Sequence, residues 1–327
     1  MRFIILALLI CVQPAFADMN KAVIVTQNKY AQFAQTSQAL VLATQTNCTA
    51  PSVMPAYHAA FDAWVEASIV LFGPLDEIGG LLSLGFWPDK KGFTAKTLRK
   101  LIAAQDIPTL EADNFAQVSI AGKGFFALDH LLGDATFNDY GSDSYTCKLV
   151  QAIAADLAHN AQIMDAKWQD EFARTIATAG QPDNALFLSP DEVAQAYLTT
   201  LAGALEYIET QRLARPLGSF EKQRPKRAEA WRTTRPLRNI EHALSAAHDL
   251  ATALGDGQIS LTQEAFVNAL DFMPRITDKD FTQIADTSNR FQAESLQTLV
   301  SVIHEAVEVE LGAHLGVTIG FNALDGD

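Results

Sequence analysis

The sequence predicts an all-α protein made of two helical-bundle domains of about four helices each. Apolar residues recur with a period near 3.6 along most of the chain, and no set of alternating strands interrupts them. The turn-forming residues 180–184 separate two halves, and 327 residues fit two domains of roughly 150 residues each. We therefore expect a signal peptide at 1–17, one bundle at 18–179 and another at 180–327.

The first 17 residues have the pattern of a cleaved signal peptide. Arg2 supplies a positive start, and residues 3–12 form an apolar run that is too short to span a bilayer. Small residues at Ala15 and Ala17 predict cleavage after Ala17. No later segment is apolar enough to cross a membrane, so we expect a periplasmic protein that is not an integral membrane protein. Association with the outer membrane stays open.

The mature chain keeps two cysteines, Cys48 and Cys147. In an oxidising compartment this even number favours a disulfide, which in the chain-entropy account contributes roughly 4–5 kcal/mol for a loop of this length. Two separate buried thiols are the alternative.

Helical periodicity covers most of the first half of the chain. The predicted helices are 19–45, 53–71, 94–104, 113–132 and 145–178. Glycines and prolines at 73–93 predict a structured loop between the second and third of them.

A capping box opens the second half. Ser189 is suited to the N-cap, Pro190 to position N1 and Glu192 to position N3. A helix is therefore expected from there to about Arg212. The helices predicted after a basic loop run to about Ala253, then from Ser260 or Thr262 as a short helix, and from Thr277 to near Gly312 or Gly316.

Composition and missing motifs narrow the function. Asp and Glu number 38 against 24 Lys and Arg, a net charge of −14, which argues against nucleic-acid binding and against docking on anionic lipid. The chain contains no HExxH, Walker, GxGxxG, CxxC, GxSxG or ExxH motif. The enzyme classes that those motifs define are therefore not expected.

Three clusters of residues are suited to binding chemistry. His58, Asp62 and Glu66 recur every fourth residue on one helix and have the ligand types of a metal site, or else form a solvated helix face.

The second cluster contains two glycines. On a helix, Gly122, Phe126, Asp129 and Gly133 would share a face. Two glycines there indicate close approach of another backbone, with Asp129 either in a site or in a salt bridge.

The third cluster is the basic segment Lys222–Arg238. It carries seven positive charges against Glu229 alone, an unusual concentration in an acidic protein. Arg232, Arg235 and Arg238 recur at intervals of three. They are suited either to a carboxylate or phosphate ligand or to internal pairing with acids of the other bundle.

Several segments resemble the imelysin-like family of exported bacterial proteins. The similar stretches are Phe72–Glu77 (FGPLDE), Gly85–Asp89 (GFWPD), Gly122–Leu132, Ala230–Ile240 (AWRxxRxLRNI) and Leu315–Asp327. The resemblance implies two helical bundles with a site between them, a periplasmic or outer-membrane setting and a link to iron uptake. The family is named after a peptidase. The cofactor stays unknown, with iron or another divalent metal as the candidate.

This chain departs from the family at its hallmark, GxHxxE. Gly124 aligns with the glycine, but Phe126 stands for the histidine and Asp129 for the glutamate. A phenylalanine cannot bind a metal or act as a base. Gly124 and Asp129 are therefore carried over as site positions and Phe126 only as part of the pocket lining.

The leading hypothesis is a non-catalytic binding or accessory protein in iron uptake or handling. Its ligand would be iron or a small anionic or metal-bearing molecule. The predicted ligand-binding residues are Gly124, Phe126, Asp129, Trp64, Trp87, Asp89, Arg232 and Arg235, and the metal candidates are Asp129, His58, Asp62 and Glu66.

Two other hypotheses are kept. The first is a metallopeptidase, which would add His304 and Glu308 to the metal candidates. The second is an interaction module for an envelope transport partner, with the tail 315–327 and the basic segment as its contact surface.

Overall fold

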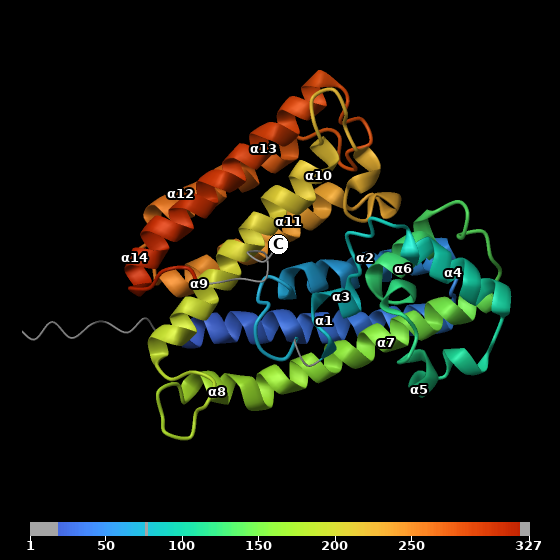
Figure 1. Cartoon of the computed structure of the whole chain (residues 1–327), viewed down its shortest axis with the longest axis horizontal. Helices are drawn as coiled ribbons and strands as arrows, with labels where there is room; N and C mark the ends of the chain where they lie inside the picture. Colours follow the sequence, from blue (N-terminus) through green and yellow to red (C-terminus); the bar gives the residue numbers. More distant parts are fainter. Residues whose placement is uncertain (1–18, 76–77, 321–327) are drawn as a thin grey trace, which may run out of the picture.

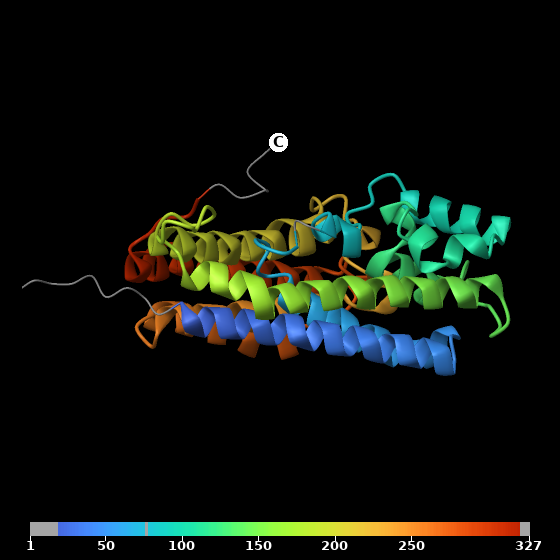
Figure 2. The same cartoon turned by 90° about the horizontal axis from the view of Figure 1, so that it is seen from below.

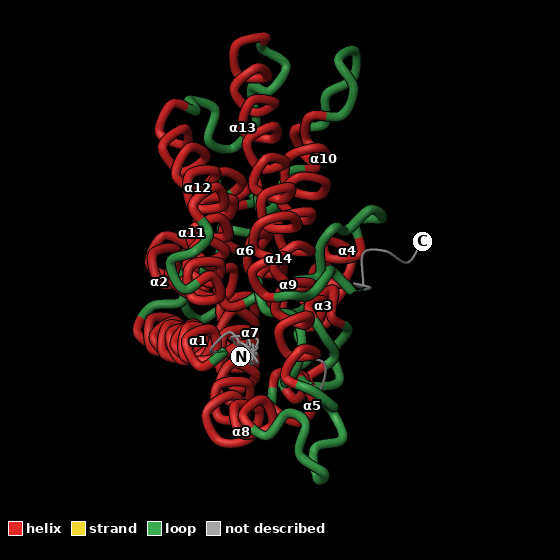
Figure 3. Tube along the Cα trace, turned by 90° about the vertical axis from the view of Figure 1, so that its left-hand side faces the viewer, coloured by secondary structure: helices red, strands yellow, loops and turns green. Residues whose placement is uncertain are grey.

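The computed structural model describes residues 19–75 and 78–320. Within these residues the chain forms helices and connecting loops and no strand, which confirms the predicted all-α class (Figure 3). The predicted signal peptide, the pair Asp76 and Glu77, and the tail from 321 onward lie outside the described residues. No helix of the described chain is long and apolar enough to cross a membrane.

Three long helices form the first group. α1 packs against α2 and against α7, and α1 and α7 run alongside each other in Figure 2. Shorter helices follow α2 and close one end of the group (Figure 1). The elements are α1 (Asn20–Thr46), α2 (Ala50–Ala67), α3 (Leu81–Leu84), α4 (Phe93–Ala104), η2 (Pro108–Leu110), α5 (Ala112–Phe115), η3 (Ile120–Gly122), α6 (Gly124–Gly133), α7 (Tyr145–Lys167), η4 (Trp168–Phe172) and α8 (Ala173–Ala177).

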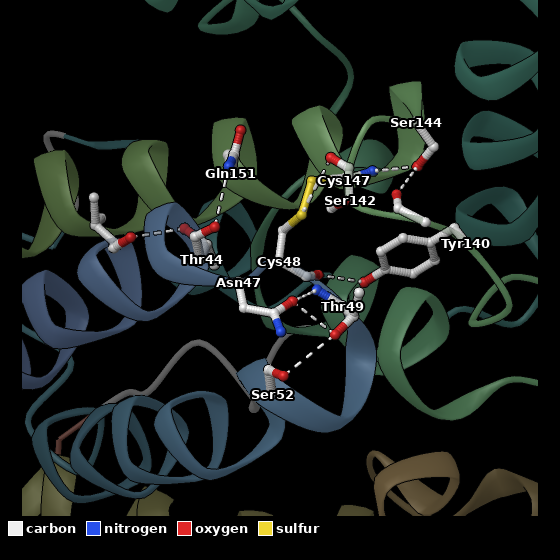
Figure 4. Close-up of a disulfide and its surroundings, with 12 residues drawn as sticks. Thr44, Asn47, Cys48, Thr49, Ser52, Tyr140, Ser142, Ser144, Cys147 and Gln151 are labelled. Carbon is white, nitrogen blue, oxygen red and sulfur yellow. Dashed lines mark hydrogen bonds between the residues drawn. A yellow bond between two sulfur atoms is a disulfide. The ribbon is translucent and has the colours of Figure 1, made fainter.

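A disulfide joins Cys48, just before α2, to Cys147 in the first turn of α7 (Figure 4). The two Cα atoms lie 5.4 Å apart, and the sequence separation is 99 residues. Tyr140 Oη donates to the carbonyl of Cys48 at 3.0 Å, and Ser144 Oγ accepts from the Cys147 amide at 3.1 Å. The expected disulfide is confirmed, and it ties α2 to α7.

The predicted helix at 113–132 is wrong in one respect, because it is broken before Gly124. α5 ends at Phe115, and α6 begins at Gly124, whose φ of +70° is a conformation that other residues rarely adopt. A Cβ at this position would collide with the carbonyl of Leu84. Gly122 therefore lies in η3 and not on the face of α6.

The second group holds the remaining helices, which cross α1 and α7 at an angle in Figure 1. Its elements are α9 (Pro190–Tyr207), η5 (Ile208–Leu213), α10 (Ala214–Leu217), η6 (Pro225–Arg227), η7 (Trp231–Thr233), α11 (Pro236–Gly255), α12 (Ser260–Phe272), η8 (Met273–Arg275), α13 (Thr287–Ala306), η9 (Val307–Leu311) and α14 (Gly312–Leu315).

The capping signals have different outcomes. Ser189 Oγ accepts from the Glu192 amide at 3.3 Å, and the Glu192 carboxylate accepts from the Leu188 amide at 2.6 Å, so the predicted capping box is confirmed. The predicted start of the last long helix at Thr277 is wrong. α13 begins at Thr287 because the carboxylate of Asp286 accepts from two amides of its first turn.

The two groups meet where α11 packs against α1 and α2. One connected cluster of buried apolar side chains runs through both groups. The division into two domains near residue 180 therefore stays a prediction. The contact between α2 and α11 is the important one for the site, because it brings the basic segment onto the polar stripe of α2.

Candidate functional site

Asp129 is the centre of one buried polar cluster. It lies on α6, is fully buried, and accepts from the Thr233 amide at 3.0 Å and from Thr233 Oγ1 at 2.7 Å. Arg232 Nη1 donates to its other oxygen at 3.3 Å. Burial raises the pKa of Asp129, although these donors act in the opposite direction. The carboxylate therefore holds η7 against α6.

Gly133 explains why η7 comes so close to α6. A Cβ placed on Gly133 would lie 2.6 Å from the carbonyl oxygen of Arg232. Only a residue without a side chain permits this approach of two backbones. Of the two interpretations of the glycine cluster, backbone packing with a salt-bridged Asp129 matches these contacts.

Asp62 is the centre of a second cluster, at the contact between α2 and α11. Arg235 Nη2 donates to Oδ1 at 2.7 Å, and Arg238 donates from Nε at 2.7 Å and from Nη2 at 2.5 Å. Burial alone would raise the pKa of Asp62, but the hydrogen bonds and charges of Arg238 and Arg235 outweigh it and lower the pKa. Asp62 is therefore an ionised partner for two arginines.

His58 and Glu66 extend this cluster along α2. His58 Nδ1 lies 2.9 Å from Arg235 Nη1, and burial, followed by the charges of Arg235 and Arg238, lowers the pKa of His58 to about 4. Glu66 pairs with Lys29 at 2.8 Å and with His242 Nδ1 at 2.7 Å. The interpretation of this stripe as a solvated helix face is wrong, because it faces α11.

Arg235 is held from several sides and is fully buried. Its guanidinium lies 4.3 Å from the ring centroid of Phe61, and its Nε donates to Asn239 at 2.9 Å. Asn239 in turn donates to Glu229 at 2.8 Å, and Glu229 pairs with Arg212 at 2.7 Å. This chain of contacts links two buried arginines through Asn239, and the Glu229 carboxylate is the ionic partner of Arg212.

The structure does not bring the metal candidates together. Among the described residues there is no group of three or more His, Cys, Asp or Glu side chains that could hold a metal ion. His304 and Glu308 lie 3.9 Å apart at the end of α13, and Glu308 lines a separate cavity of about 590 Å³ with Asp191 and Glu192. Asp62 and Asp129 have arginines as their partners.

Phe126 lies in an aromatic stack. Its ring is nearly parallel to that of Trp87 at a centroid distance of 6.1 Å and meets Phe61 edge-on at 5.6 Å. Trp64 is buried beside Phe33, at 5.2 Å. The side chain that stands in place of the hallmark histidine thus packs against apolar neighbours.

Asp89 has a local structural contact. Its carboxylate accepts from the amides of Phe93 at 3.0 Å and Thr94 at 2.8 Å, at the start of α4. Burial would raise its pKa, but these backbone hydrogen bonds lower it. Asp89 therefore caps the first turn of α4.

Sequence reasoning missed several residues around the site. Glu229, Asn239 and Arg212 complete the network of Arg235, and Arg215 lies 5.4 Å from the ring centroid of Trp87. Glu229 had a signal, because it is the one acid within the basic segment. Arg212 and Arg215 lie before that segment, on a helix end where nothing in the spacing marks them.

Comparison with known proteins defines the class of protein. Residues 26–307 match the family model Imelysin, Peptidase M75, so the chain belongs to the imelysin family. No curated protein matches the chain.

Two solved structures share the fold. An imelysin-like protein from Psychrobacter arcticum 273-4 has a TM-score of 0.75 at 18% identity, over 93% of this chain and 99% of that one. A protein assigned as an iron-regulated protein A precursor from Parabacteroides distasonis ATCC 8503 has a TM-score of 0.70 at 14% identity, over 92% and 97% of the two chains. At these identities the likeness is one of fold.

Proposed function

We propose that this protein is a non-catalytic binding protein of the imelysin family that acts in iron uptake or iron handling. Family membership supports the proposal, and one protein of similar fold is assigned as iron-regulated. The sequence pattern at 1–17 supports export with cleavage after Ala17, and it therefore supports a periplasmic mature protein. An envelope transport protein is a suitable partner there.

The side chains at the hallmark positions, Phe126 and Asp129, support a function without catalysis. Phe126 has no atom that can bind a metal or accept a proton, and it is packed between Trp87 and Phe61. Asp129 accepts three hydrogen bonds from Thr233 and Arg232. A carboxylate in this arrangement holds the backbone of η7 and is not placed to activate a water molecule.

The ligand position follows from the same residues. Trp87 is half-buried next to Phe126, whereas Trp64 is buried in the core. We therefore place the ligand on the side of Trp87, where the loop before α4 meets the end of α9 and α10. The ring of Trp87 meets that of Tyr207, the last residue of α9, edge-on at a centroid distance of 6.0 Å.

The test is metal and chelate binding by protein purified without a His tag. Elemental analysis and equilibrium dialysis with ferrous iron and with ferric citrate are expected to show reversible iron binding. Trp87→Leu is expected to weaken it at least fivefold. The exposed aromatic Phe220, at a loop tip, supplies the matched control Phe220→Leu, which is expected to leave binding unchanged.

Two results would count against the proposal. One is the absence of iron binding in either form. The other is cleavage of a broad peptide library that stops when a chelator is added, because that outcome identifies a metallopeptidase instead.

A further inference from the structure

Five arginines of the second half have carboxylate partners at short range. The pairs are Arg212 with Glu229 at 2.7 Å, Arg232 with Asp129 at 3.3 Å, Arg235 with Asp62 at 2.7 Å, Arg238 with Asp62 at 2.5 Å and Arg290 with Glu294 at 2.7 Å. Because these charges are already compensated inside the chain, an external anion would have to compete with an intramolecular carboxylate for each of them.

Arg215 and Arg227 differ from these five. Within residues 19–75 and 78–320, no carboxylate forms an ion pair with either of them. Arg215 makes one hydrogen bond, from Nη1 to Gln211 Oε1 at 3.3 Å, and its enclosed Nε has no partner among the described atoms. Burial, and then the charge of Arg227, lower the pKa of Arg215. A second acceptor would stabilise this guanidinium.

Aromatic rings lie beside Arg215 and beside Lys226, which precedes Arg227 in the chain. The Arg215 guanidinium is 5.4 Å from the centroid of Trp87, and Lys226 Nζ is 5.7 Å from that of Trp231. Trp87 and Trp231 are half-buried, and Lys226 and Arg227 are exposed. We name the set Arg215, Lys226, Arg227, Trp87 and Trp231 the basic–aromatic face.

We propose that the basic–aromatic face binds a small organic oxyanion, with Arg215 and Arg227 on its carboxylate or phosphate oxygens and Trp87 against its carbon skeleton. A guanidinium presents two parallel N–H donors to such a group, and the indole gives an apolar surface next to it. The inference rests on the proposed function, since it names the chemical class of the ligand at the position beside Trp87.

The experiment measures anion binding without iron. Citrate and inorganic phosphate are titrated separately into the full mature protein by isothermal calorimetry, and the tighter of the two identifies carboxylate or phosphate as the preferred group. Arg215→Gln is expected to weaken binding at least tenfold, which is about 1.4 kcal/mol. Arg227→Gln, at an exposed position, is expected to weaken it at least threefold.

Arg275 supplies a matched control. It is an exposed arginine, 5.9 Å from the ring centroid of Phe272, so Arg275→Gln removes the same kind of cation–ring contact elsewhere. It is expected to leave anion binding unchanged. The inference is overturned if neither anion binds the wild-type protein, or if Arg275→Gln weakens binding as much as Arg215→Gln and Arg227→Gln do. Iron binding without anion binding would remove this inference alone, and anion binding without iron would remove the iron link.

Discussion

Arg235 and Arg215 are chemically identical side chains that lie beside aromatic rings, yet their surroundings differ. Arg235 is fully buried over Phe61, with Asp62 as an ionic partner at 2.7 Å. Arg215 lies over Trp87 and has no carboxylate partner among the described residues. Burial is the largest cause that lowers the pKa of each. The difference separates an arginine whose charge an internal acid compensates from one that has no carboxylate partner among the described residues, and the proposed ligand would act on the second.

Removal of the Asp62 carboxylate is expected to have the largest effect. Asp62→Ala leaves Arg235 buried with its charge uncompensated, so the free energy of unfolding should fall by about 3–5 kcal/mol in urea titrations. Asp249→Ala removes a more exposed acid, which pairs with Lys29 at 2.9 Å, and should lower stability by less than about 1 kcal/mol. Equal losses in the two variants would contradict a structural role for the Asp62 pair.

A smaller loss is expected from crowding the contact between α6 and η7. In Gly133→Ala the new Cβ would lie 2.6 Å from the Arg232 carbonyl oxygen, which should destabilise the protein by about 1–3 kcal/mol. Gly141→Ala is the control, because its Cβ would meet no atom within 4 Å, and a change within about 0.5 kcal/mol is expected. Thermal unfolding of both variants checks this. If Gly133→Ala were neutral, the close backbone approach would not matter for stability.

Acid is expected to weaken the α2–α11 contact. The pKa of His58 is about 4 in the folded protein and near 6.5 for an ordinary histidine, so the unfolded chain takes up the proton first. The contribution of His58 to stability is complete above about pH 6.5 and is lost as the pH falls towards 4. Asp62 and Glu66, whose pKa values are lowered, add a further loss at lower pH.

Urea titrations at pH 7, 5.5 and 4.5 measure this loss. Substitution of His58 by glutamine should flatten the decline between pH 6.5 and 4.5. The same substitution at the exposed His159 should leave the decline as it is in the wild type. A decline that does not depend on His58 would show that other groups cause it.

The smallest effect on stability is expected at Arg215. Arg215 has no ionic partner among the described residues and has one enclosed nitrogen atom without a hydrogen bond. Arg215→Gln should therefore change the free energy of unfolding by less than about 1 kcal/mol. Arg235→Gln should lower the free energy of unfolding by more than about 2 kcal/mol. The shorter side chain removes the buried hydrogen bonds that Arg235 makes to Asp62 and Asn239. Comparable losses would erase the distinction between the two arginines.

Local signals in the sequence predicted the helices well. The capping box at Ser189 and the disulfide between Cys48 and Cys147 are confirmed. The two errors have different causes, one a contact with a distant residue and the other a local cap that the sequence prediction overlooked. The helix expected at 113–132 breaks because Gly124 packs under the carbonyl of Leu84, and α13 starts at Thr287 because Asp286 caps it.

The candidate site was less predictable. The sequence placed His58, Asp62 and Glu66 on one face, and it marked the arginines of the basic segment. It could not say that the two sets meet, because α2 and α11 are separated by more than half of the chain. It also missed Arg215, whose significance depends on Trp87 and on the absence of a carboxylate partner among the described residues.

The sequence by itself determined the helical class, most helix boundaries and membership of the imelysin family, because these depend on local periodicity, capping residues and short motifs. Only the tertiary structure decided which charges compensate one another. Pairing of charges depends on distances between segments that are remote in the chain, and on how deeply packing removes each group from water. For that reason Asp129 and Asp62 became internal anchors, while Arg215 and Arg227 have no carboxylate partner in the part of the chain that the structure describes.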